Sequence, residues 1–371
     1  MAARMIAFRY IADQPALADL CADLRGTAWL ALDTEFIRES TYYPRLCLIQ
    51  IASADHIACI DPLALPTLEP LLDRLYDPAT TKILHSASQD LEIFFHWRGA
   101  VPAPIFDTQL AALALGQGNQ TGYAALVQQL LGVDLAKTHT RADWRRRPLP
   151  PEWLAYAADD VRHLPELYQR QRAALEQRGW LAALAEDFAA LADPARYRPQ
   201  PLAVWQRVRE QQRLRGVQRA ALRQLAAWRE EQAIACDRPR RWILDDAALI
   251  DLARRLPETL ADLQHLPDLP AMTRHRHGET LLARIATARA EPPECWPDPP
   301  GRPQLSPRQA AQVDDLLGQI EERACQYRIS PQALADRRDV QNLLAGLDSP
   351  LRHGWRAAAM GREWLERAIG R

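Results

Sequence analysis

Long hydrophobic runs are missing from this chain of 371 residues, and none approaches the roughly 20 residues that cross a bilayer, so the sequence predicts no membrane span. The first residues mix charges early and lack the apolar core of a secretory signal, so we expect a cytoplasmic protein. The six cysteines are scattered without a CxxC pair, which argues against a zinc site or a disulfide framework. Lysine is scarce as well, because 44 of the 46 basic residues are arginine, a choice that genomic base composition can explain.

Hydrophobic residues make up 48% and charged residues 25% of the chain, as in ordinary globular proteins, and the length predicts two or three domains. The net charge of −1 hides an uneven distribution, since residues 1–195 carry a net −7 and residues 196–371 a net +6. Residues 196–241 contain 12 arginines and only four acidic residues. This pattern favours a carboxylate-rich site joined to a surface for a polyanion. A solvated basic helix face explains the basic run at least as simply.

The first half of the chain alternates between strand and helix patterns. Residues 28–61 contain three short apolar segments close together, which predicts an antiparallel meander. Residues 81–86 predict a further strand, residues 105–115 a helix, and residues 151–175 one long helix. An Arg-rich loop bounded by proline occupies residues 135–150. Together these patterns predict an α/β domain with a mixed sheet.

After about residue 195 the strand patterns end and only helical patterns continue. Two Pro-rich linkers, at residues 193–201 and 291–307, separate the helical stretches. We therefore predict an α/β domain at residues 1–195 and helical domains at residues 196–291 and 300–371.

Two acids share one face near the end of the first apolar strand. Asp33 and Glu35 are alternate residues, so both side chains point to the same side of the sheet. Carboxylates placed side by side repel each other unless a cation lies between them. A position on the solvent face of an edge strand explains the pair equally well, so its meaning depends on the residues that accompany it.

Three further residues follow on helix patterns. Asp90 lies near a strand-to-helix junction, where an ordinary first-turn acid is also common. Tyr156 and Asp160 are four apart on the long predicted helix, so they share one of its faces. Four carboxylates without a partnering His or Cys are hard oxygen ligands, suited to Mg²⁺ or Mn²⁺ and poorly suited to zinc. Four acids can hold two such ions about 3.5–4 Å apart, an arrangement that serves phosphodiester cleavage.

The order of these residues resembles the DEDD superfamily of 3′→5′ exonucleases. ALDTEF, HSASQDLEIF and YAADDV are similar to its three motifs, and the tyrosine at position 156 is typical of the tyrosine subgroup. TYYPRLCLIQIA, FDTQLAA and TRADWRRRPLP look specifically like the ribonuclease D family. Residues 202–290 resemble the HRDC domain, and the last helices faintly resemble a second, degenerate one. The resemblance implies an RNase H-like α/β exonuclease domain followed by all-α HRDC-type domains.

The resemblance also implies a role for each motif residue. Asp33, Glu35, Asp90 and Asp160 would hold two divalent cations, Mg²⁺ or Mn²⁺, and Tyr156 would position the attacking water. The implied activity is release of nucleoside 5′-monophosphates from the 3′ end of RNA, with tRNA precursors as substrate. Neither a membrane nor an obligate protein partner is implied.

Aromatic and basic residues around the motifs are candidates for RNA contact. Phe36 and Tyr42 lie close behind the first acid pair and could stack on bases. Arginines of the 135–150 loop and of the HRDC-like region could bind phosphates. These arginines are Arg141, Arg145, Arg146, Arg147, Arg207, Arg209, Arg213, Arg215 and Arg219.

Three polar residues near the motifs have simpler structural interpretations. His85 could contact the terminal nucleotide, but a structural histidine at a strand end is the more common case. Asp107 is expected to cap the helix that follows it. Gln50 is expected to form hydrogen bonds within the sheet.

Two other functions stay open at this point. The same fold could degrade DNA, because an HRDC-type domain permits DNA binding. Alternatively, the helical part could hold nucleic acid without catalysis, although intact acids at all four motif positions argue against a module of that kind.

Overall fold

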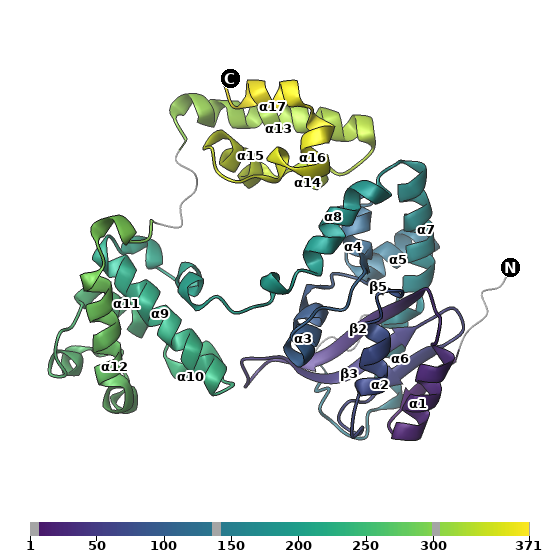
Figure 1. Ribbon diagram of the computed structural model, residues 1–371, viewed down its shortest axis with the longest axis horizontal. Coiled ribbons are helices and arrows are strands. Elements are labelled where there is room, and N and C mark those ends of the chain that lie inside the picture. The colour runs from purple at the N-terminus through teal and green to yellow at the C-terminus, as the bar shows by residue number, and fades with distance from the viewer. Residues whose placement is uncertain (1–6, 136–141, 299–304, 371) are drawn as a thin grey trace. The chain divides into compact units, whose positions relative to one another are not determined.

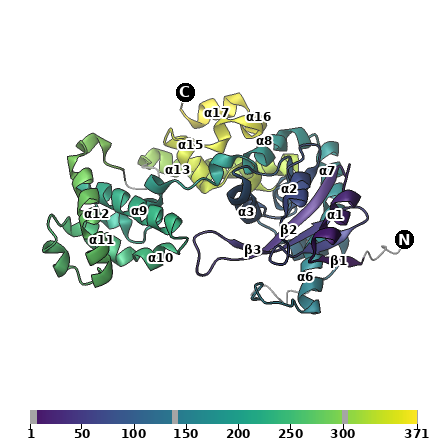
Figure 2. The ribbon, with the colours of Figure 1, turned by 60° about the horizontal axis from the view of Figure 1, so that its bottom comes forward.

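The computed structural model describes residues 7–135, 142–298 and 305–370, which form two compact units. Unit 1 holds the described parts of Met1–Ile37, Arg45–Tyr197 and Pro303–Arg371. Unit 2 holds those of Arg38–Pro44 and Arg198–Arg302. A sheet with helices makes up most of unit 1, whereas unit 2 is helical (Figures 1 and 2). The predicted fold class, an α/β domain with a mixed sheet and a helical part after it, is confirmed.

The sheet of unit 1 has six strands in the order β1-β4-β3-β2-β5-β6. The strands are β1 (Phe8–Ile11), β2 (Trp29–Ile37), β3 (Arg45–Ala52), β4 (Ile57–Ile60), β5 (Thr81–Leu84) and β6 (Ile105–Asp107). β2, β3 and β4 form the predicted antiparallel meander, and the other pairings are parallel. β1 was not predicted, and the segment at 105–107 is a short strand where the sequence favoured a helix. Both are edge strands of three or four residues, too short to give a clear period.

Helices cover both faces of this sheet. Alternate residues of β2 point to opposite sides, so Leu30 and Leu32 join one cluster and Ala31 joins another. The first cluster packs against α1 (Gln14–Asp23), α2 (Glu69–Leu75) and α3 (Ser88–Arg98). The second packs against α4 (Thr108–Ala114), α5 (Tyr123–Leu131), α6 (Pro151–Arg162), α7 (Leu164–Gln177) and α8 (Leu181–Leu191). The sheet is therefore buried between two helical layers.

The single long helix predicted over 151–175 is interrupted. α6 ends at Arg162 and α7 begins at Leu164, with His163 between them. Pro165 has no N–H to donate to the Val161 carbonyl four residues earlier, and proline is tolerated in the first turn of a helix, which explains why one helix ends and another begins here.

The C-terminal helices pack as part of unit 1 rather than as a domain of their own at residues 300–371. They are α13 (Pro307–Tyr327), α14 (Pro331–Leu334), α15 (Arg337–Leu344), α16 (Gly354–Met360) and α17 (Arg362–Ala368). The Trp355 indole and the Arg356 guanidinium each donate a hydrogen bond of 2.7 Å to the Asp187 carboxylate of α8. The buried apolar residues of these helices share one cluster with the sheet face that packs on α6. That shared core is a tertiary feature that the Pro-rich linker pattern could not indicate.

Unit 2 is built around α9 (Val217–Ala235), α10 (Arg240–Ile243), α11 (Asp246–Arg255) and α12 (Ala271–Ala290). Its core holds Trp205 and Trp228, which are 3% and 1% exposed. The loop Arg38–Pro44 between β2 and β3 also belongs to this unit, because the Tyr42 hydroxyl donates to Glu230 and its backbone N–H to Asp237.

One lysine of the sheet is fully buried. The Lys82 ammonium donates to the backbone carbonyls of Asp77, Thr80 and Ala103 at 3.0, 2.6 and 2.5 Å. These three acceptors satisfy a charged group that would otherwise be costly to bury.

In the part of the chain that the structure describes, no helix is both long and apolar enough to span a bilayer.

Candidate active site

Strand β2 carries Asp33 and Glu35 past the end of its neighbour β5. β5 pairs with β2 only over Trp29–Ala31, so the two acids lie just beyond the point where β5 stops. Both are half-buried and point to the same face of the sheet. On the other side β3 continues beside them, with Gln50 opposite Asp33. The hydrogen-bonded ladder to β3 therefore fixes the backbone that carries both acids.

Asp90 reaches this place from the first turn of α3, the helix that follows β5. It is 6% exposed and accepts a hydrogen bond from the hydroxyl of Thr34, the residue between the two acids of β2. Asp107 at the end of β6 caps α4, as predicted, and also accepts from the backbone N–H groups of Ser86 and Ala87 at 3.2 and 2.9 Å. Asp107 thereby holds the turn that leads into α3.

Helix α6 brings Tyr156 and Asp160 to the same site. Both are half-buried and lie four residues apart on one side of the helix. The end of α6 is held by Tyr123, whose hydroxyl donates to the Asp159 carbonyl at 3.0 Å and accepts from the His163 N–H at 3.2 Å. The apolar side of α6 anchors it through buried Leu154, Ala157, Ala158 and Val161.

The four carboxylates influence one another's charge. Burial, and then the negative charges of the other three, raise the pKa of Asp33 well above its usual value. Burial together with the charges of Asp160 and Asp90 raises the pKa of Glu35 to about 8. Burial is also the main cause that raises the pKa of Asp90 to about 6 and that of Asp160 to about 7. The same causes raise the pKa of Tyr156, so its hydroxyl keeps its proton at neutral pH. Four acids from three elements thus converge on one place.

Gln50 is a polar residue at this site whose role sequence reasoning did not find. It is fully buried and, within the described ranges, neither its amide oxygen nor its amide nitrogen has a hydrogen-bond partner. Among the described residues, the hydrogen bond expected within the sheet is therefore not formed. Cross-strand partners project to the same face, so this amide lies beside Asp33. An orphaned buried amide fits a site that a bound, hydrated group completes.

The chemistry of this donor set fits hard divalent cations. Four carboxylates without a nearby thiolate offer oxygen ligands of the kind that Mg²⁺ and Mn²⁺ prefer. Among the described residues, however, no three His, Cys, Asp or Glu side chains already stand together as a metal-binding group. In this arrangement the carboxylates repel one another, and a bound cation would offset that repulsion.

Family models match parts of this chain, and relatives match nearly all of it. Residues 8–176 match the family model described as 3′-5′ exonuclease, and residues 218–285 match that of the HRDC domain. The chain is 39% identical to ribonuclease D of Granulibacter bethesdensis, over 94% of this chain and 89% of that one. It is 37% identical to ribonuclease D of Pseudomonas paraeruginosa, over 96% of both chains.

The chain belongs to the ribonuclease D family. The crystal structure of Escherichia coli RNase D, an exoribonuclease involved in structured RNA processing, superposes with a TM-score of 0.85 and 33% identity, covering 98% of this chain and 99% of that one. The protein is a 3′→5′ exoribonuclease, a hydrolase that binds RNA, and its family suggests dependence on a divalent metal ion.

In this member of the ribonuclease D family, the aromatic residues expected at the RNA have mixed surroundings. Tyr42 is only 7% exposed, its hydroxyl is bonded to Glu230, and the Arg240 guanidinium lies 4.9 Å from its ring centre. A buried ring covered in this way serves the structure of unit 2, so the expected base stacking at Tyr42 does not fit. Phe36 is half-buried against the sheet core. His85 is half-buried, with its Nδ1 2.9 Å from the Thr108 hydroxyl, and its contact with RNA stays a prediction.

The arginines of the loop before α6 are of two kinds, those on the surface and one with a structural role. Arg145 pairs with Asp143 at 2.9 Å, and the Arg146 guanidinium lies 6.0 Å from the ring centre of Trp153. Arg147 has a structural role instead, because it donates twice to the buried Asp61 carboxylate, at 2.5 and 2.6 Å. Arg141 lies outside the described residues.

The arginines of unit 2 also differ in exposure. Arg207, Arg209, Arg213 and Arg215 are exposed, which suits phosphate contact, although Arg213 pairs with Glu210 at 2.7 Å. Arg219 is 8% exposed and donates to the carbonyls of Leu214 and Pro297, so it is a structural residue. These burials distinguish candidates that the sequence alone had grouped together.

Proposed function

We propose that this member of the ribonuclease D family trims 3′ extensions of tRNA precursors, using two divalent cations held by Asp33, Glu35, Asp90 and Asp160. The observation that carries the proposal is the convergence of four acids from β2, α3 and α6, each with a raised pKa. Acids that repel one another in a half-buried site lower the stability of the folded protein. Carboxylates with pKa values perturbed in this way are typical of functional sites.

Each residue would have a distinct part. Asp33 would contribute to both ions, Glu35 and Asp160 to the first, and Asp90 to the second. When bound, the ions would make an attacking water more acidic and offset charge on the leaving 3′ oxygen. Tyr156, protonated at neutral pH, would hold that water in place through its hydroxyl.

The substrate class rests on similarity. The RNase D of Escherichia coli, which covers nearly the whole of this chain, is described as acting in structured RNA processing. A tRNA precursor is such an RNA, with a folded body that stops a 3′→5′ enzyme and a single-stranded trailer for it to remove.

Digestion of a 3′-extended tRNA, with product identification, tests the proposal. With Mg²⁺ or Mn²⁺ we expect nucleoside 5′-monophosphates and a shortened tRNA, and with EDTA neither. Asp33→Asn should abolish release while the protein still folds, as judged by circular dichroism. Full activity of Asp33→Asn, or equal activity in EDTA, would contradict the site. Preference for a DNA strand of the same sequence over RNA would contradict the substrate.

A further inference from the structure

We propose that a basic pocket of unit 2, beside Trp242, is a subsite for one nucleotide of single-stranded RNA. The pocket has a volume of about 430 Å³ and is lined by residues of the Arg38–Pro44 loop, of α9 and α10, and of the segment around Arg207. This size falls within the range of roughly 300–1,000 Å³ common for small-ligand sites. The subsite rests on the proposed function only in taking single-stranded RNA as the ligand.

The charge of the pocket favours a phosphate. Five arginines line it against one glutamate and one aspartate. Arg207 and Arg241 are exposed and make no ion pair within the described residues, so their guanidinium groups remain available. Arginine can bind a phosphate with two parallel hydrogen bonds, which makes it well suited to this task.

Trp242 supplies an aromatic face beside these charges. It is 61% exposed, which is unusual for the largest apolar side chain. The Arg238 guanidinium lies 5.7 Å from its ring centre, so a further cation stands next to the indole. Alternating aromatic and basic groups are what single-stranded nucleic acid binds, because every base has a face to stack and every linkage a charge.

Buried interactions hold the floor of the pocket in place. Arg240 pairs with the buried Glu230 and covers the Tyr42 ring. Arg229, which is 4% exposed, donates to the Leu244 carbonyl at 2.9 Å and to Asp246 at 2.8 Å. These arginines are structural, and they fix the lining of the pocket to which they belong. The pocket is thus preformed, which reduces the entropy lost on binding.

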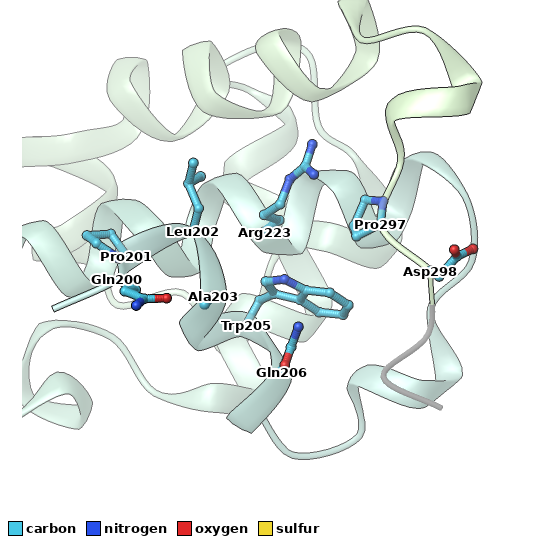
Figure 3. A pocket seen from close by; sticks show the side chains of 9 residues that line it. All are labelled: Gln200, Pro201, Leu202, Ala203, Trp205, Gln206, Arg223, Pro297 and Asp298. Carbon is cyan, nitrogen blue, oxygen red and sulfur yellow. The ribbon is translucent and has the colours of Figure 1, made fainter. Parts of the chain in front are cut away.

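A second pocket of unit 2 offers a useful contrast (Figure 3). Its volume is about 710 Å³, and Leu202, Trp205 and Pro297 are among its lining residues. The single arginine among its labelled lining residues, Arg223, is paired with Glu291. That pocket offers apolar surface without available positive charge, so size alone does not mark the RNA subsite.

An acidic peptide is the other ligand that arginines attract. A peptide carboxylate would use the cations but would gain little from the exposed face of Trp242. The indole beside the arginines therefore favours a nucleotide, in which a flat base and a charged phosphate are joined at short range.

Binding measurements in EDTA test the subsite without cleavage. The probe is a labelled oligouridylate of about 12 nucleotides, within the range of single-strand site sizes, followed by fluorescence anisotropy. Trp242→Ala should weaken binding roughly tenfold, the loss expected for one base–aromatic stack. Trp242→Phe should restore most of the affinity. Arg241→Gln should weaken binding and lower the salt slope by about 0.7.

Three controls make the result specific. Trp97→Ala removes a tryptophan of unit 1 that is 45% exposed, and Arg276→Gln removes an exposed arginine outside the pocket; both should bind as the unaltered protein does. With an abasic strand of the same length, Trp242→Ala should have no effect, because there is no base to stack.

The outcomes separate this proposal from the catalytic one. Unchanged affinity of Trp242→Ala, an equal loss on the abasic strand, or displacement of the RNA by polyglutamate at equal charge would overturn the subsite. If Trp242→Ala binds normally while Asp33→Asn is inactive, the subsite fails and the active site stands. Weakened binding by Trp242→Ala together with an active Asp33→Asn would support the subsite and contradict the active site.

Discussion

The acidic site of unit 1 and the basic pocket of unit 2 place charge in opposite ways. The acids are buried or half-buried on elements of a sheet domain, and their pKa values are raised by burial and mutual repulsion. The arginines proposed to meet RNA are exposed, whereas Arg229 and Arg240 of the same pocket are paired with Asp246 and Glu230. One region holds like charges together at a cost in stability, whereas the other keeps its charge in water at little cost.

This difference follows from what each region has to bind. A small cation must be surrounded closely by its ligands, so the acids are carried by the strands and helices of a sheet domain. An RNA strand is long and flexible, and exposed guanidinium groups can follow it while counterions are released. Variants of the acidic site should therefore change the rate of cleavage, and variants of the basic region should change affinity and its dependence on salt.

The largest effect on activity is expected from a change in the acidic site of unit 1. Asp160→Asn should lower kcat on 3′-extended RNA by about 10³-fold or more, since a metal ion contributes several kcal/mol to charge stabilisation. Asp159→Asn is the matched control, because that neighbour pairs with Arg162 at 2.7 Å, and it should stay within a few-fold of the unaltered rate. Equal losses in both variants would place the effect in helix stability instead of the site.

A smaller effect, on RNA binding, is expected from changes to the exposed arginines of unit 2. The combined change of Arg207, Arg213 and Arg215 to Gln should weaken binding of single-stranded RNA roughly tenfold and lower the salt slope by up to about 2. Affinity measured between about 50 and 200 mM salt gives both values. A control with the same loss of charge replaces exposed Arg254, Arg276 and Arg338. An identical slope in the two triple variants would reduce the first set to a general charge effect.

The smallest effect is a dependence of stability on pH, to which the acidic site of unit 1 should contribute and the basic pocket of unit 2 should not. Carboxyls whose pKa is raised on folding stabilise the folded state below about pH 4 and lose that contribution as the pH rises through the folded pKa values. For Asp90, Asp160 and Glu35 that window extends through about 6, 7 and 8. In EDTA, Tm should therefore fall by a few degrees toward pH 8.

Magnesium should reverse this trend. Ligands must be deprotonated to bind it, so Mg²⁺ should raise Tm more at pH 8 than at pH 6. Glu35→Gln should flatten the slope in EDTA, because it removes the group whose pKa is raised to about 8. Thermal unfolding at both pH values, with and without Mg²⁺, measures the effect. A Tm increase from Mg²⁺ that is the same at both pH values would contradict the link between carboxylate charge and metal binding.

Local periodicity carried much of the site. Alternation on a strand is enough to place Asp33 and Glu35 on one face, and a spacing of four is enough to align Tyr156 with Asp160. The meeting of β2 with α3 and α6 came from the motif resemblance, since no local rule relates segments so distant in the chain. The mixed sheet was predicted from local patterns, because β2, β3, β4 and β5 are apolar segments that alternate with or precede helical ones, whereas the short edge strands β1 and β6 were missed.

What the sequence could not show depends on partners that folding supplies. Tyr42 and Arg147 looked like RNA contacts by type and position, yet Glu230 and Asp61 bind them in the folded protein. Gln50 looked like an ordinary sheet residue, and only the register across β3 and β2 reveals an unbonded amide beside Asp33. Trp242 was not singled out, because exposure of a tryptophan is known only once the core is known.

The buried ammonium of Lys82 gives the molecule a chemical reporter of its own. Because that amine is enclosed by three carbonyls, an acylating reagent can reach it only when the sheet opens. The sequence has just one other lysine, so mass spectrometry of the acylated chain resolves the two sites without ambiguity. The rate at which Lys82 is modified would then report how often the sheet of unit 1 opens. Optical methods do not detect such rare openings, because almost all molecules are folded at any time.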